Sequence, residues 1–357
     1  MKTIHRQSVG IDCAKDELVV AFGVMEEDFE VKVISNKAFP NNKKGHRALW
    51  SWSRKLMQPD LALSYVVEAT GVYHESIALF LYEQGAAISV MLPNKVKHFA
   101  ATLTIKTVTD KTAAQAIAMM GLEKKLDSWE PPAEVFNQMK QLSREQEQLT
   151  QELTVIKSQL HAEQAGAWPN KGSIKRMKQR VKLIKAQKDA VLRELMALVK
   201  GHSWLDEQVD NICTIKGVGF ATAVTVIAET NGFNLIKNKK QLVSYAGLDV
   251  VEKTSGTSVR GKTRISKRGN RYLRKAMYFP AWTAIRYDKR MGKLYEKLVS
   301  KHAIKMKAGV AVQRKLLELI YTLWKTGQPY DPNYEQNRKK LGQPNRTALN
   351  EMAHDLS

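Results

Sequence analysis

Two long helical repeats in the middle of the chain restrict its fold more than any other feature. After Pro131-Pro132, apolar side chains recur in steps of three, four and seven, at Met139, Leu142, Leu149, Leu153, Ile156 and Leu160. A breaker at residues 165–172 interrupts the pattern, which resumes from Ile174 to Leu198. This spacing predicts two helices with coiled-coil seams. They form either an antiparallel spacer hairpin or an oligomerisation arm, and both interpretations stay open.

The first third of the chain has the alternating pattern of an α/β domain. The predicted strands cover residues 7–12, 18–24, 29–34, 61–68 and 87–92. The predicted helices cover residues 42–57, 74–84 and 109–122. Three strands followed by alternating helices and strands predict a mixed sheet flanked by helices. Residues 201–330 read as mostly helical, so the whole chain is predicted to combine an α/β part with an α part.

The charge balance points to a polyanionic partner. The chain has 57 Lys and Arg against 35 Asp and Glu, a net charge of +22. Nucleic acid is the usual partner of such a surface. With Cys13 and Cys213 alone, neither a disulfide framework nor a cysteine metal cluster is expected, and the eight histidines lack ligand spacing. No uncharged run reaches the ~18 residues of a membrane span, so we expect a protein of the reducing cytosol.

One basic stretch holds most of this charge. Between Lys253 and Lys315 there are 19 Lys and Arg against two acids, so the window carries 17 of the 22 net positive charges. We expect its cations to bind phosphates, because arginine holds phosphate oxygens with paired hydrogen bonds. The candidates are Arg260, Lys262, Arg264, Lys267, Arg268, Arg271 and Arg274.

Ser255 lies at the leading edge of this stretch, beside Gly256. One interpretation is a turn hydroxyl in a loop rich in Gly and Thr. The other is a nucleophile that attacks a phosphodiester while the neighbouring cations stabilise the charge that develops.

Three carboxylates are candidates for a metal site. Asp12 and Glu68 each stand at the end of a predicted strand, and Asp110 opens an alanine-rich helix. Taken singly, each is an ordinary turn or cap residue. Neighbouring strands bring such ends together, however, and clustered carboxylates need cations. Mg²⁺ suits an all-oxygen site of this kind and supports phosphoryl transfer.

Residues 212–223 contain a second nucleic-acid signal. Two apolar helical segments are joined through Gly217-Val-Gly219, as in a helix-hairpin-helix. The backbone N–H groups of such a turn can hold a phosphate without reading its sequence. A tight helix–helix turn with no ligand is the alternative interpretation.

Taken together, the motifs resemble one known family, the IS110 group of insertion-sequence transposases. Val9-Gly-Ile-Asp12-Cys-Ala-Lys15, Val67-Glu68-Ala-Thr-Gly71-Val-Tyr73 and Lys106-Thr-Val-Thr-Asp110 are similar to its RuvC-like DEDD domain. Ile215-Lys-Gly-Val-Gly219, Tyr245-Ala-Gly-Leu248 and Ser255-Gly-Thr-Ser-Val-Arg-Gly261 resemble its C-terminal transposase domain. They occur in the family's order and spacing.

The resemblance implies a recombinase guided by a structured bridge RNA that pairs with target and donor double-stranded DNA. It also implies that Asp12, Glu68 and Asp110 are three of four acids that hold Mg²⁺, and that Ser255 forms a transient phosphoserine link. The family's site is composite, built in a dimer of dimers. The implied setting is the bacterial cytoplasm, at the nucleoid and away from membranes.

The resemblance also gives the expected domains. These are a RuvC-like, metal-dependent domain at 1–128, coiled-coil helices at 129–200, a serine-bearing domain at 201–330 and a flexible tail at 331–357.

One position departs from the family pattern. The fourth acid would fall at Ala113, one helical turn after Asp110. Either three acids suffice, or an acid has been replaced to trap a complex before cleavage, which we favour. Two other functions stay open: a RuvC-like junction resolvase in which a metal-activated water attacks, and a nucleic-acid-binding protein without catalysis.

Overall fold

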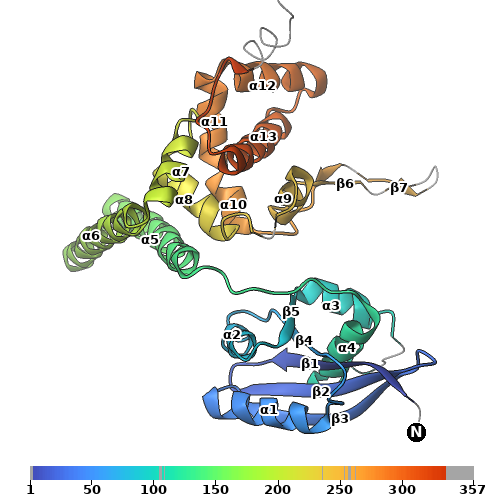
Figure 1. Cartoon of the computed structure of the whole chain (residues 1–357). Coiled ribbons are helices and arrows are strands. Elements are labelled where there is room, and N and C mark those ends of the chain that lie inside the picture. The colour runs from blue at the N-terminus through green and yellow to red at the C-terminus, as the bar shows by residue number, and fades with distance from the viewer. Residues whose placement is uncertain are drawn as a thin grey trace, which may run out of the picture. The chain divides into compact units, whose positions relative to one another are not determined.

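The computed structural model describes residues 3–103, 107, 109–234, 236–252, 254–255, 259–261 and 263–334 (Figure 1). Its contacts divide the chain into two compact units, which meet between Pro131 and Pro132. In the part of the chain that is described, no helix is long and apolar enough to cross a membrane.

A five-stranded mixed sheet forms the centre of the first unit (Figure 1). Its strands are β1 (Ile4–Cys13), β2 (Glu17–Glu26), β3 (Val31–Pro40), β4 (Leu63–Glu68) and β5 (Ala87–Met91). They lie in the order β3-β2-β1-β4-β5. Strand β2 is antiparallel to both of its neighbours, β1 and β3, whereas β4 and β5 run parallel to β1. This is the mixed sheet that the sequence predicted.

Helices cover both faces of this sheet. They are α1 (Lys43–Leu56), α2 (Glu75–Glu83), α3 (Pro93–Ala100) and α4 (Asp110–Glu123). Val67 of β4 packs in one core with Leu49 of α1 and Leu81 of α2. Its neighbour Val66 points the other way and packs with residues of α3 and α4. A strand buried on both faces explains the continuous apolar run of β4.

Glycine allows α4 to lie close against β1. A Cβ atom at Gly10 would lie 2.2 Å from the backbone nitrogen of Ala118 and 2.3 Å from the carbonyl oxygen of Ala114. At Gly121, a Cβ would lie 2.2 Å from the Ser8 hydroxyl oxygen. The two glycines therefore fix the helix on the strand, and with it the start of α4 near the end of β1.

The predicted third strand was wrong in its bounds. Residues 29–34 were expected, whereas β3 begins at Val31 and continues to Pro40. Phe29 lies in the preceding turn, with a left-handed φ of 63°. The later residues Ser35, Asn36 and Lys37 break the apolar alternation, but their backbone groups still pair with β2 along its length.

The second unit is almost entirely helical. Two long helices, α5 (Glu134–Ala165) and α6 (Lys171–Lys200), pack against one another through Met139, Ile156, Ile184 and Leu195. The predicted seams therefore meet within one protomer as a hairpin. Whether this hairpin also joins protomers, and whether it is a domain separate from residues 201–330, remain predictions.

Seven further helices and two short strand pairs complete the described part of this unit. The helices are α7 (Ser203–Cys213), α8 (Phe220–Glu229), α9 (Lys239–Tyr245), α10 (Arg271–Ala276), α11 (Tyr278–Tyr287), α12 (Lys289–His302) and α13 (Lys305–Thr326). The strand pairs are β6 (Val250–Val251) with β9 (Arg264–Ile265), and β7 (Thr254–Ser255) with β8 (Val259–Arg260). Of the predicted tail, residues 335–357 lie outside the described residues.

Candidate active site and nucleic-acid interface

The sheet brings the three predicted acids to one end of the first unit. Asp12 is the next-to-last residue of β1 and Glu68 the last of β4. These strands are parallel neighbours, with Ile11 opposite Val67, so both carboxylates stand at the same edge. Asp110 is the first residue of α4, which packs on β1. Strand pairing and helix packing thus gather three acids from distant parts of the sequence.

The carboxylates influence one another electrostatically. Burial raises the pKa of Asp12, and the charge of Asp110 raises it further. Burial also raises the pKa of Glu68, with a second contribution from Asp12. Asp12 is therefore the central acid, because the charge of Asp110 acts on it and its own charge acts on Glu68. Each ionised carboxylate makes ionisation of its neighbour less favourable, and a bound cation would remove this repulsion.

Cys13 lies beside this group but does not belong to its chemistry. Burial, followed by the charges of Asp12 and Glu68, raises the pKa of the Cys13 thiol to about 12. A nucleophilic or metal-binding cysteine must lose its proton. At neutral pH, Cys13 therefore stays a protonated core side chain.

Ala113 lies in the first turn of α4, where the fourth acid was expected. The Thr109 hydroxyl caps the helix by accepting the backbone N–H of Thr112, and the Ala113 N–H donates to the Thr109 carbonyl at 2.8 Å. The cap holds the turn in regular geometry without an acid. Ala113 itself supplies only a methyl group to the site.

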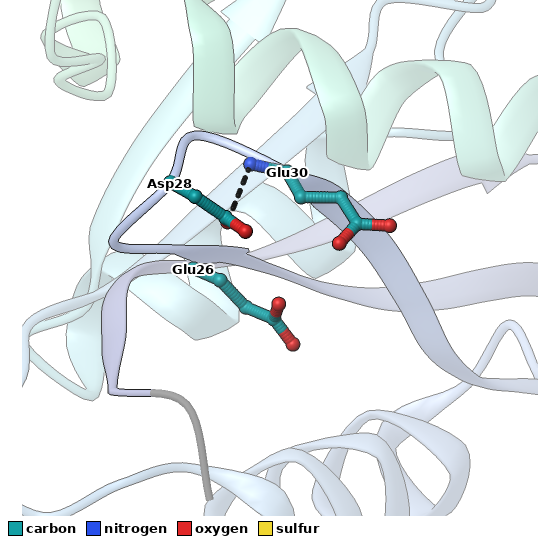
Figure 2. A group of neighbouring side chains, drawn as sticks. All are labelled: Glu26, Asp28 and Glu30. Carbon is teal, nitrogen blue, oxygen red and sulfur yellow. Dashed lines mark hydrogen bonds between the residues drawn. The ribbon is translucent and has the colours of Figure 1, made fainter.

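A different acidic group lies at the β2–β3 turn (Figure 2). Glu26, Asp28 and Glu30 form the one group of three acids in the described chain whose ligand atoms all lie within 4.8 Å. Asp12, Glu68 and Asp110 are spaced more widely. In the turn, however, the Lys32 ammonium lies 3.0 Å from both Glu26 and Glu30, and Asp28 accepts the Glu30 backbone N–H. These contacts account for the clustering of the three acids without a bound metal ion.

Ser255 lies on a narrow strand pair of the second unit. It belongs to β7 and stands opposite Val259 of β8. The strands β6 and β9 flank this pair in the sequence and also pair with each other, with Val251 opposite Arg264. The predicted cation Lys262 lies outside the described residues.

Tight contacts secure the base of this serine arm, residues 250–265. The Ser266 hydroxyl donates to the Asp249 carboxylate at 2.5 Å, and the Lys267 N–H donates to the Gly247 carbonyl. Lys267 itself has a left-handed φ of 54°. Arg274 Nη1 donates to the carbonyls of Ala246 and Gly269 at 2.8 and 3.1 Å. Arg274 was predicted to bind nucleic acid. Its Nη1 atom instead links the two segments that flank the arm.

A buried carboxylate that the sequence analysis missed lies below the arm. Glu229, at the end of α8, accepts Arg144 Nε at 2.7 Å, Arg144 Nη2 at 3.0 Å and Asn270 Nδ2 at 2.6 Å. The Asn270 side-chain oxygen in turn accepts the N–H groups of Tyr272 and Leu273 at the start of α10. Glu229 therefore fixes the helix that follows the arm. The sequence signal that could have identified Glu229 is a single acid at the end of an otherwise uncharged helix.

The helix-hairpin-helix prediction is confirmed as geometry. Helix α7 ends at Cys213, and α8 begins after Gly219. Gly217 has a φ of +93°, and a Cβ there would lie 2.6 Å from the Pro280 carbonyl oxygen of α11. Nothing lies within 4 Å of a Cβ at Gly219, and Lys216 is exposed. The turn is packed on one side and open on the other.

Two models of transposase domains match successive parts of the chain. The DEDD transposase model of the IS110 type matches residues 9–169, and the model of the IS116/IS110/IS902 transposase family matches residues 209–296. The two matched domains define a transposase. The chain belongs to the IS110 family of transposases.

Relatives extend over nearly the whole chain. A pilin gene-inverting protein of Moraxella bovis is 25% identical over 328 residues, which cover 90% of this chain and 97% of the relative. An IS110 insertion-element protein of Streptomyces coelicolor is 24% identical over 145 residues, covering 41% of this chain and 35% of the relative. Among solved structures, Thermus thermophilus RuvC bound to a Holliday junction matches at 13% identity and a TM-score of 0.24, over 32% of this chain and 90% of RuvC.

Proposed function

We propose that this transposase exchanges DNA strands under the guidance of a structured RNA, with Mg²⁺ held by acids of the first unit and Ser255 as nucleophile. The observation that carries the proposal is that Asp12, Glu68 and Asp110 lie at one end of the sheet, where burial and a neighbouring carboxylate raise the pKa values of Asp12 and Glu68. Such a carboxylate cluster fits phosphate chemistry.

The residues present fit a hard divalent cation. The site offers carboxylate oxygens, and the thiol of Cys13 stays protonated beside them. Mg²⁺ prefers oxygen ligands and retains several waters, so a set of carboxylates completed by water suits it. When bound, the metal would neutralise charge on a phosphodiester. Asp12, Glu68 and Asp110 would hold the metal.

Ser255 would act on the phosphorus of one DNA strand. Its oxygen would form a bond to phosphorus as the bond to the leaving sugar oxygen breaks, and the hydroxyl proton would pass to a base or to solvent. The strand is thereby stored as a phosphoserine ester until another strand's hydroxyl displaces the serine. Arg260 and Arg264, on the same arm, would balance the charge of the phosphorane.

The proposed partners are target and donor double-stranded DNA, a bridge RNA and further copies of this chain. The net charge of +22 supports polyanion binding. If base pairing to RNA selects the DNA, the protein needs only backbone and shape contacts. A site composed across a dimer of dimers would bring acids of one protomer to the serine of another.

Strand exchange tests the catalytic part of the proposal. Ser255→Ala should abolish cleavage and the covalent protein–DNA adduct, while Ala113→Asp should increase Mg²⁺-dependent exchange. Cleavage that survives Ser255→Ala would instead identify a RuvC-like resolvase that uses water. Absence of cleavage even in Ala113→Asp, with salt-sensitive binding intact, would identify a non-catalytic nucleic-acid-binding protein.

Sequencing the nucleic acid that copurifies with the protein from its host tests the RNA partner. A single discrete RNA encoded beside the gene supports guidance. A protein that purifies with no RNA, yet binds specific DNA, would favour direct readout of the DNA sequence.

A further inference from the structure

The exposed face of α11 combines aromatic rings with cations. Phe279 and Tyr287 expose 74% and 66% of their surface and lie eight residues apart on α11, slightly more than two turns. Exposed side chains at this spacing continue back into α10, because Met277 between the helices keeps a right-handed helical backbone. We name this set the α11 stripe: Arg271, Lys275, Phe279, Thr283, Arg286 and Tyr287.

Phe279 is held in place although most of its ring faces water. Its ring meets Tyr278 edge to face, with centroids 5.2 Å apart. Tyr278 contacts Trp282 at 6.3 Å, and Trp282 contacts Tyr295 of α12 at 5.8 Å. This line of rings connects the exposed phenyl group to the interior of the unit. An aromatic ring fixed by its neighbours loses little freedom when a ligand stacks on it.

The charge around the stripe has one sign. From Arg271 to Tyr287 the sequence contains four cations and no acid. Two of the cations are already engaged, Lys275 with Glu147 and Arg274 with backbone carbonyls. Arg271 lies over the Tyr272 ring, at 4.9 Å from its centroid, and Arg286 is exposed. An exposed ring among cations complements a flat, anionic chain.

The helix-hairpin-helix turn borders the same face. A Cβ at Gly217 would lie 3.0 Å from the Thr283 Cβ, so the turn packs directly against the middle of the stripe. Lys216, which precedes Gly217 in that turn, is exposed. A glycine turn with an exposed cation thus adjoins the helix that carries the exposed ring.

We infer that the α11 stripe binds single-stranded RNA, with an unpaired base stacked on Phe279 and its flanking phosphates near Arg286 and Lys216. A ring can stack on a base only where the base is unpaired, because duplexes bury their base faces. The inference rests on the proposed function, in which the RNA partner supplies unpaired loops whereas both DNA partners are duplexes.

Binding of the full-length protein to a fluorescein-labelled, unstructured single-stranded RNA tests this inference. Phe279→Ala should weaken binding roughly tenfold or more, and Phe279→Trp should restore it. The same RNA annealed to its complement should bind the wild-type protein and Phe279→Ala equally. Phe29→Ala is the matched control, because Phe29 is 71% exposed but lies among Glu26, Asp28 and Glu30.

The salt dependence separates stacking from charge. Phe279→Ala should leave the slope of log K against log salt unchanged, whereas Arg286→Ala should reduce its magnitude by about 0.7, as expected for one single-strand phosphate contact. Equal single-strand affinities for Phe279→Ala and Phe29→Ala would overturn the inference. So would a Phe279→Ala variant that changes only the oligomeric state in sedimentation, since the stripe would then bind a second copy. Wild-type protein that binds no RNA at all would contradict the proposed function as well.

Discussion

Arg144 on α5 and Glu229 on α8 form a two-pronged ion pair across 85 residues of sequence, with bonds of 2.7 and 3.0 Å. The Glu229 side chain is 1% exposed, whereas Arg144 keeps 37% of its side chain in solvent and lies 4.5 Å over the Tyr272 ring. The hydrogen bonds and the charge of Glu229 raise the pKa of Arg144, so the guanidinium stays charged. It joins the helical hairpin to the base of the serine arm.

Arg144→Ala should therefore destabilise the second unit by about 3 kcal/mol, because it leaves a buried carboxylate with Asn270 as its remaining side-chain donor. Thermal unfolding followed by circular dichroism measures this loss. Lys315→Ala, which breaks the more exposed pair with Glu318, is the control and should cost less than about 1 kcal/mol. Equal losses of stability in the two variants would show that the buried pair contributes no more to folding than the exposed one.

Gly10→Ala should move α4 away from β1 and cost about 1–3 kcal/mol or more, because the added methyl meets the backbone of Ala114 and Ala118. The shift should also weaken the Mg²⁺-dependent rise in melting temperature, since α4 carries Asp110. Gly23→Ala is a matched change one strand away, where the nearest atom is the flexible end of Leu122 at 3.1 Å. If Gly10→Ala melts like the wild-type protein, the close approach of α4 does not position the acids.

Asp12→Asn should raise the melting temperature in EDTA and remove most of the stabilisation by Mg²⁺. Without a metal, burial and the charge of Asp110 make the ionised carboxylate of Asp12 unfavourable, so an amide relieves the repulsion. With a metal, the central ligand is lost, and mass action no longer favours the folded state. Calorimetry in EDTA and in MgCl₂ measures both effects, and a variant that still gains full stability from Mg²⁺ would place the ion elsewhere.

His46 should make the first unit less stable in acid. Its imidazole is buried, with Nε2 2.9 Å from Asn41 Oδ1, and burial lowers its pKa. Because Oδ1 only accepts, the neutral ring donates from Nε2. The folded pKa is lower than the unfolded value of 6.5, so this contribution is complete above pH 6.5 and is lost as the pH falls through the folded pKa.

Melting temperatures between pH 7.5 and pH 5, compared for the wild-type protein and His46→Gln, check this dependence over about two units around the histidine pKa. The variant should lose less stability on acidification, by no more than about 1.4 kcal/mol per pH unit. Identical curves would assign the acid sensitivity to other groups.

The sequence predicted those features that depend on local pattern. Helix α1 begins after the Asn42 cap, one residue inside the predicted 42–57, and the long helices follow their apolar seams. The edge that gathers Asp12 and Glu68 followed from strand ends, because parallel neighbours share one end of a sheet. The bounds of β3 were wrong because a backbone ladder, rather than side-chain alternation, extends that strand.

The missed features come from single long-range contacts. Glu229 meets Arg144 and Asn270 at separations of 85 and 41 residues, and no periodicity marks a buried pair of this kind. Arg274 resembled the other cations of the basic stretch, yet its Nη1 bonds to two carbonyls. Charge composition indicates a phosphate-binding surface, but only packing shows which cations are already engaged.

The two ends of the serine arm are held together. Asp249 and Ser266 bond to one another, so the chain leaves and re-enters the helical unit at nearly the same place. A change in the length of residues 250–265 should therefore leave the packing of the flanking helices intact.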